Sequence, residues 1–195
     1  MASPVVGAQT LCIGDTCGRV WVKDPDAQTN EEAQTIAQEA VDEVLAETSF
    51  LTHFPQWRVV TTGPVSGVGG STDAENLTIR VYASPGRTHD EYVTTVLHEM
   101  GHVVDFEWVT DSIRFEYRAI RGLQDDVPWS REVSDDVHGD DRWRFGQEDL
   151  AEIVVAILTD GDHVPRSDAI AAAPEPDDLD RIARLIDPDG VFLVP

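Results

Sequence analysis

Residues 94–105 read TTVLHEMGHVVD, and the HEMGH at the centre of this stretch decides how the rest of the chain is interpreted. If the stretch is helical, His98 and His102 lie one turn apart and face the same way. Two imidazoles so placed can hold one zinc ion, with Glu99 beside them to accept a proton from water. Gly101 lowers helix propensity by about 1 kcal/mol relative to Ala. Its missing side chain lets another backbone or side chain approach the site closely.

The residues before this stretch predict that it is a helix. Residues 76–83, NLTIRVYA, alternate apolar and polar side chains as a strand does, and a Ser-Pro-Gly turn follows. Thr88 and Glu91 have the spacing of a capping box. We therefore expect a helix over residues 90–108, preceded by a strand that forms a sheet edge and pairs with extended substrate. The apolar residues at helical spacing are Val93, Val96, Leu97, Met100, Val103 and Val104.

Length, apolar content and net charge limit the kinds of molecule that this chain is expected to bind. A chain of 195 residues is long enough for one domain, which we expect to span residues 1–195. No apolar run is long enough to span a bilayer. The net charge is −23, with Lys23 as the single lysine. Such a surface repels nucleic acid and anionic membranes, so we expect neither as a partner, and we expect a monomer. It attracts cationic peptides, although adaptation to high salt is another source of the acidity.

Cys12 and Cys17 flank a Gly-Asp turn signal, and this spacing suits a small disulfide-closed hairpin. A zinc site of this spacing would need two more ligands nearby, and none is there. A disulfide implies an oxidising compartment. We therefore expect a secreted protein, although residues 1–10 lack the features of a signal peptide. The alternative is a cytoplasmic protein of a high-salt organism with two reduced thiols.

A second informative stretch is residues 146–158, GQEDLAEIVVAIL, a short and strongly apolar helical pattern. Glu148 and Glu152 are four residues apart and share a face of this helix. Acids near a helix N-terminus are common because the helix dipole favours them. A helix this apolar is buried on most sides, however, and two carboxylates at its buried end fit a metal ion and a histidine.

The order of the remaining patterns predicts an α+β fold, with a small antiparallel or mixed sheet packed against the active-site helix and a mostly helical C-terminal half. Within the domain we assign residues 76–108 to the edge strand and active-site helix, 143–160 to a third-ligand helix and 175–195 to a C-terminal helix and tail. The other expected elements are helices at 30–47, 112–121 and 177–186, strands at 57–62 and 191–194, and a loop at 63–75. The remaining histidines, expected to be ordinary surface or loop residues, are His53, His89, His138 and His163.

Together, HEMGH and the Glu-Asp-x-Ala-Glu pattern at 148–152 resemble the gluzincins, the thermolysin-like branch of zinc metallopeptidases, and small secreted bacterial proteins of that group. The resemblance covers residues 76–108 and 143–158. It implies a zincin-like fold and one bound zinc ion. The metzincin pattern does not fit, because it needs Gly at position 105 and a ligand at 108, where this chain has Asp105 and Trp108.

The resemblance also implies roles for individual acids. In gluzincins the third zinc ligand is a Glu on a downstream helix, and an acid four residues later orients one zinc-binding histidine. Carried over, Glu148 is the third ligand, with Asp149 as the alternative, and Glu152 accepts a hydrogen bond from His98. We expect Asp105 to brace the motif helix or its partner.

The activity implied is that of a zinc metalloendopeptidase acting on peptides or proteins, with Glu99 as general base. Gluzincins add a side chain that stabilises the oxyanion, and the candidates here are His138, Tyr117 and Arg144. Two other hypotheses remain open. One is a zinc-stabilised binding module with a peptidase fold and no turnover, and the other is a structural protein in which the motif is accidental.

Overall fold

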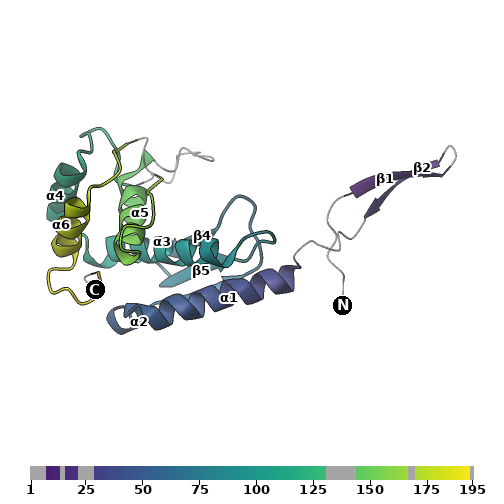
Figure 1. Cartoon of the computed structure of the whole chain (residues 1–195), viewed down its shortest axis with the longest axis horizontal. Coiled ribbons are helices and arrows are strands. Elements are labelled where there is room, and N and C mark those ends of the chain that lie inside the picture. The colour runs from purple at the N-terminus through teal and green to yellow at the C-terminus, as the bar shows by residue number, and fades with distance from the viewer. Residues whose placement is uncertain (1–7, 14–15, 22–28, 131–143, 167–169, 194–195) are drawn as a thin grey trace.

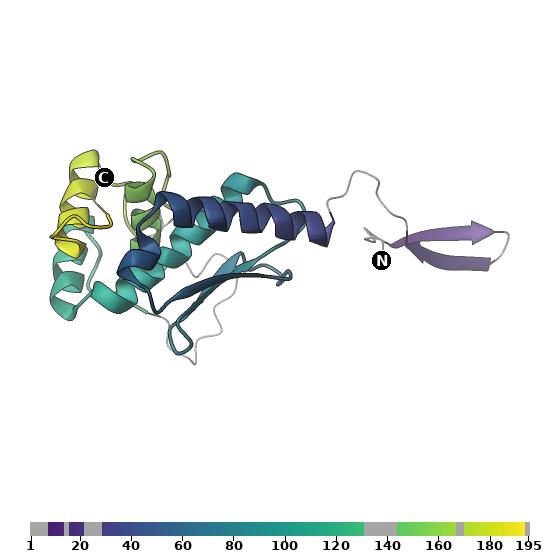
Figure 2. The ribbon, with the colours of Figure 1, turned by 90° about the horizontal axis from the view of Figure 1, so that it is seen from below.

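The computed structural model describes residues 8–13, 16–21, 29–130, 144–166 and 170–193, the first two ranges as backbone alone. Within these ranges the chain forms six helices, a three-stranded mixed sheet and a two-stranded hairpin (Figures 1 and 2). This arrangement confirms the predicted α+β class. None of the helices described combines the length and the apolarity needed to cross a bilayer.

The three-stranded sheet has the order β3-β5-β4, where β3 is Arg58–Thr62, β4 is Gly70–Asp73 and β5 is Thr78–Tyr82. The central strand, β5, is parallel to β3 and antiparallel to β4. The prediction that this strand forms a sheet edge is therefore wrong, and so is the prediction of a continuous loop at 63–75. Because Ile79 and Val81 of β5 are fully buried, this strand occupies the middle, and the glycine-containing β4 forms the edge.

Two long helices, α1 (Asn30–Glu47) and α3 (His89–Trp108), pack against each other and against the sheet. α1 contacts β3, whereas α3 contacts β4 and β5, so both helices cover one face (Figure 2). Each begins with a complete capping box, and the one at the start of α3 is the predicted pair of Thr88 and Glu91. The short helix α2 (Phe50–His53), which the sequence analysis missed, follows α1.

The C-terminal half contains α4 (Asp111–Arg121), α5 (Gly146–Leu158) and α6 (Pro176–Ile186), and is mostly helical as predicted. α5 packs on α3, and α6 packs on both α4 and α5.

The strand predicted at 191–194 does not form in the part described, residues 191–193. Phe192 and Leu193 are buried, and their N–H groups each donate to Asp187 Oδ2 at 2.7 Å. A side-chain carboxylate, and not a neighbouring strand, therefore satisfies this backbone.

The hairpin consists of β1 (Ala8–Ile13) and β2 (Thr16–Trp21), paired antiparallel. Its register places Cys12 directly opposite Cys17. Directly opposed residues in an antiparallel pair have Cα atoms about 4.5–5.5 Å apart, within the range that a disulfide spans. The side chains of both strands lie outside what the structure describes, so the disulfide stays a prediction.

Helices α3 and α5 cross at Gly101. A Cβ atom added to this glycine would lie 2.6 Å from Ala151 Cα and 3.1 Å from Ala151 Cβ, closer than atoms can pack. The expectation that Gly101 admits a close neighbour is confirmed, and the neighbour is the backbone of α5. This crossing sets the distance between the two helices that carry the candidate ligands.

Replacing Gly101 by Ala should therefore destabilise the fold. The substitution adds about 1 kcal/mol of helix propensity, but overpacking at such a contact costs about 1–3 kcal/mol and separates the helices. We expect a lower free energy of unfolding, measured by urea denaturation, together with weaker zinc binding. The control is Gly63→Ala, since a Cβ there meets nothing within 4 Å. Equal stability of both variants would contradict the inferred role of the crossing.

Candidate metal centre

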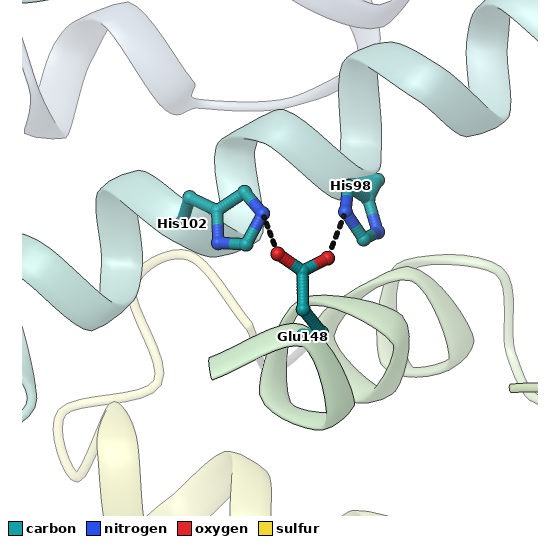
Figure 3. Close-up of side chains that lie close together, drawn as sticks. All are labelled: His98, His102 and Glu148. Carbon is teal, nitrogen blue, oxygen red and sulfur yellow. Dashed lines mark ion pairs between the residues drawn. The ribbon is translucent and has the colours of Figure 1, made fainter. Parts of the chain in front are cut away.

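Three side chains that can ligate a metal meet between α3 and α5. His98 and His102 project from α3 toward Glu148 in the first turn of α5 (Figure 3). His98 Nε2 lies 3.3 Å from Glu148 Oε2, and His102 Nε2 lies 3.6 Å from Glu148 Oε1. Ligands about 2.1 Å from a tetrahedral zinc ion are about 3.4 Å apart, so this spacing suits an ion of that size. One potential ligand atom from each residue lies within 4.8 Å of the others, and the group could hold a metal ion.

The far side of the His98 ring is held by Glu152. Its Oε1 lies 2.9 Å from His98 Nδ1, and the Glu152 side chain is fully buried. This is the contact that the family resemblance implies. A carboxylate at Nδ1 holds a proton there and leaves Nε2, the nitrogen nearer Glu148, available to a metal.

The other oxygen of Glu152 has two further partners. Oε2 lies 2.9 Å from His163 Nε2 and accepts a hydrogen bond of 2.9 Å from the Arg166 N–H. His163 does lie in a loop, as expected, but it is not an ordinary loop residue, because it contacts the buried Glu152. His163 lies in the loop after α5, so the sequence has no helical spacing that would relate it to the candidate ligands. The short sequence distance to Glu152 was the one available sign that the two could meet.

The carboxylates around His98 favour its charged form. Burial by itself lowers the pKa of His98, but hydrogen bonds to Glu148 and Glu152 and the charge of Glu99 outweigh it and raise the pKa to about 10. Burial likewise tends to raise the pKa of Glu152, yet hydrogen bonds from His163 and His98 hold that pKa well below its ordinary value. In the absence of a metal, a proton on His98 thus supplies positive charge that the centre requires.

Glu99, the candidate general base, is buried and held by the edge strand. Thr72 Oγ1 lies 2.7 Å from Glu99 Oε2 and 3.0 Å from the Glu99 carbonyl oxygen, and its hydroxyl donates toward both. A Cβ atom on Gly70 would lie 2.8 Å from Glu99 Oε1, so only glycine lets β4 pass this close. Gly70 and Thr72 fall in the region predicted as a loop, and the sequence gives no sign of their contacts with Glu99.

The hollow in front of these residues has a volume of about 360 Å³. The two histidines, Glu99 and Glu148 line it together, and Thr72 and Phe106 form part of its wall. Phe106 is 59% exposed, which is unusual for a phenylalanine and places an apolar surface beside the centre.

Asp149 and Tyr117 lie on the other side of α5. Asp149 is fully buried, pairs with Arg121 at 2.8 Å and accepts a 2.6 Å hydrogen bond from the Tyr117 hydroxyl. Burial, and then the charge of Asp149, raise the pKa of Tyr117 well above its ordinary value. Both side chains are committed to this buried network, which joins α4 to α5. Neither the alternative ligand role of Asp149 nor the oxyanion role of Tyr117 fits the structure.

Asp105 links α3 to the start of α5. Its Oδ1 accepts a 3.0 Å hydrogen bond from Trp129 Nε1, and the Trp129 ring packs against Gly146, where a Cβ would lie 2.7 Å from it. Burial raises the pKa of Asp105, while the charge of Arg114 opposes that rise. The contact with Trp129 agrees with the predicted bracing role.

Of the last two oxyanion candidates, Arg144 is not among the residues that line the hollow. His138 lies outside the described residues, and Arg144 is exposed just before α5.

The affinity for a metal ion should keep rising with pH above about 6.5, the ordinary pKa of a histidine. With a pKa of about 10, metal-free His98 stays protonated at neutral pH, and a metal ion must displace that proton. We expect the apparent zinc affinity to rise about ten-fold per pH unit between pH 6 and pH 8, measured by competition with a chelator. An affinity that levels off above pH 7 would show that His98 has an ordinary pKa.

His163→Ala should weaken metal binding without touching a ligand. The substitution removes one of the two hydrogen-bond partners of Glu152 Oε2 and loosens the carboxylate that orients His98. Loss of such outer contacts costs about 10–100-fold in metal affinity. Zinc competition assays at fixed pH measure this, with His89→Ala as control, because His89 pairs with Glu43 away from the centre. If the two variants bind zinc equally tightly, His163 does not support the site.

Comparisons of this chain with models of protein families, with curated proteins and with solved structures found no match. The function is therefore argued from the chemistry and geometry of the centre itself. The centre combines three potential metal ligands, a carboxylate held by Thr72 and a hollow in front of them.

Proposed function

We propose that this chain is a zinc-dependent peptidase with a zincin-like fold of the gluzincin type. The observation that carries the proposal is the convergence of His98, His102 and Glu148 from two crossing helices, with Glu99 on the wall of the same hollow. Two imidazoles and one carboxylate are the protein ligands typical of a catalytic zinc site that keeps one position open.

The donor set fits zinc in number and type. Imidazole nitrogen and carboxylate oxygen both suit zinc, and the carboxylate of Glu152 behind His98 matches the outer hydrogen bond that zinc histidines usually have. A zinc ion bound here would polarise the scissile carbonyl and acidify the attacking water.

Glu99 is the proposed general base. Oε2 is engaged by Thr72, whereas no residue that the structure describes makes a hydrogen bond to Oε1. Oε1 can therefore take a proton from the attacking water as the new C–O bond forms. The same carboxyl group then gives this proton to the leaving amine as the C–N bond breaks. Thr72 keeps the carboxylate oriented through both transfers.

The edge strand β4 offers a place for the substrate. One side of β4 pairs with β5, and the structure describes no strand on its other side. Residues at both ends of β4 line the hollow of the centre, so a peptide added to this edge passes in front of Glu99. Addition of a peptide as an extra β-strand, with main-chain bonds for affinity and side-chain pockets for selectivity, fits the edge strand β4 and not the central strand β5. His138 and Arg144 stay as candidates for stabilising the oxyanion.

The test is peptide cleavage by the zinc-loaded chain and by Glu99→Gln. We expect Glu99→Gln to keep its zinc and to lose about 10²–10⁴-fold in turnover, because the amide cannot accept the proton. Glu148→Ala should instead lose zinc affinity. The matched control is Glu116→Gln, an exposed acid on α4, which should retain both properties. A peptide library read by mass spectrometry, with zinc content by elemental analysis, measures both.

Each alternative has its own outcome. Zinc uptake with no cleavage by any variant indicates a zinc-stabilised binding module. No zinc uptake by the wild-type chain would remove the metal centre and the peptidase proposal with it. A fully active Glu99→Gln would exclude Glu99 as general base while leaving the metal site intact.

A further inference from the structure

A second hollow, of about 410 Å³, continues from the metal centre along α3. It shares Gly70, His98 and Glu99 with the hollow already described, so the two meet at the candidate general base. Its basic side chains are Arg87 and Arg166. Glu91 and Glu99 line it as well, so the formal charges of the hollow balance, whereas the whole chain has 37 acidic and 14 basic residues.

Arg87 is held firmly but is not neutralised. Its Nη2 donates to the Glu91 carbonyl oxygen at 2.7 Å and to Thr95 Oγ1 at 2.6 Å, and the guanidinium lies 4.7 Å from the centre of the Tyr92 ring. Nη1 is buried and has no hydrogen-bond partner in the part of the chain that the structure describes. No carboxylate of that part lies within ion-pair distance of Arg87 either. Arg87 is half-buried, and a buried N–H donor without an acceptor, such as Nη1, is costly; an anionic ligand that accepts from it would offset that cost.

Each of the two acids that line this hollow has one carboxylate oxygen held by a hydrogen bond. The Glu91 carboxylate accepts the 2.7 Å hydrogen bond from the Thr88 N–H that caps α3, and Glu99 is held by Thr72. Arg166 also lines the hollow, but its Nε lies 3.6 Å from the buried carboxylate of Glu152, and its side chain is 54% exposed. Arg87, with the unpartnered Nη1, is therefore the arginine best placed to pair with a carboxylate of a ligand.

The position of the edge strand β4 indicates which part of a bound peptide would lie at this hollow. Gly69 and Gly70, at the start of β4, lie at this hollow, and the end of β4 lies at the other one. An added strand is more often antiparallel than parallel to its neighbour. An antiparallel peptide would enter past Thr72 and leave past Gly70. Its residues after the scissile bond would then lie beside Arg87.

We propose that this hollow binds a carboxylate of the substrate on the C-terminal side of the scissile bond, with Arg87 as the main specificity-determining residue. The inference rests on the proposed peptidase function. The carboxylate comes either from an Asp or Glu side chain or from the free C-terminus of the peptide. A planar guanidinium suits a carboxylate from either source.

The experiment compares cleavage of matched peptides by the zinc-loaded chain. The peptides differ in carrying Asp, Asn or Lys at each of the first positions after the scissile bond, and each has a free or an amidated C-terminus. We expect kcat/KM about ten-fold or more higher for Asp than for Asn in the preferred position. Acid preference in amidated peptides identifies a side-chain carboxylate as the ligand, whereas dependence on a free C-terminus identifies the terminal carboxylate.

Arg87→Gln should bring the preference ratio close to one. Arg184→Gln, on the outer face of α6 with a side chain 71% exposed, is the matched control and should keep the wild-type ratio. Thermal melting checks that Arg87→Gln is folded, since Arg87 also braces the first turn of α3. If it is not folded, Arg166→Gln is used and should lower the ratio. Absence of any carboxylate preference in the wild type, or an unchanged ratio in the folded variant, would overturn the proposal.

A binding measurement separates this inference from the proposed function. Titration of the zinc-loaded chain with succinate, followed by NMR, reports carboxylate binding whether or not any peptide is cleaved. Binding that weakens about ten-fold in Arg87→Gln and not in Arg184→Gln supports the subsite even if the chain is not a peptidase. Equal binding by all three proteins rejects the subsite. Cleavage that depends on Glu99 but shows no carboxylate preference keeps the peptidase and removes the subsite.

Discussion

The contact between Gly101 and Ala151 is the constraint on which the candidate metal centre depends. The two histidines of α3 lie three residues before and one residue after Gly101, and Glu148 and Glu152 have the same offsets from Ala151. With about 3.6 residues per turn, both offsets fall on one side of each helix. A single close crossing therefore brings two residues of each helix together. A larger residue at the crossing would move both pairs apart at once, which explains a glycine in the middle of a long helix.

Charge then decides what the crossing can hold. Three carboxylates, from Glu99, Glu148 and Glu152, lie around two imidazoles in a largely buried place. Such a group is stable only with a cation or with protons, and the raised pKa of His98 reflects this requirement. The neighbouring Asp149 is turned about 100° around α5 and pairs with Arg121, so it is neutralised separately. Glu148 thus belongs to the candidate metal centre, whereas the adjacent Asp149 anchors α5 through its pair with Arg121.

Local sequence patterns were sufficient to predict the five longer helices and much of the candidate centre, but not the short helix α2. The capping box of α3, the shared face of His98 and His102, and the contact between Glu152 and His98 all follow from spacing or from the family resemblance. Edge strand β4 could not be predicted because Gly70 and the preceding Gly69 have low strand propensity. Gly70 packs on Glu99 and Gly69 packs on Arg87, and only the fold shows these contacts. Tyr117 was misassigned because its partner is 32 residues away in sequence, and only the fold brings the two together.

The overall charge and the charge of the second hollow act over different distances. At physiological salt the field of a net −23 surface is screened beyond about 8 Å, and within that layer it attracts cations and repels acidic peptides. A carboxylate about 4 Å from a guanidinium in a partly buried site gains about 4 kcal/mol of direct attraction, more than a diffuse surface field opposes at contact. In the proposed peptidase, the surface would therefore affect the rate of encounter, and Arg87 would set the bound register. A substrate with cationic flanks and one carboxylate just after the scissile bond would satisfy both, so an acidic protein is compatible with the proposed carboxylate-binding subsite.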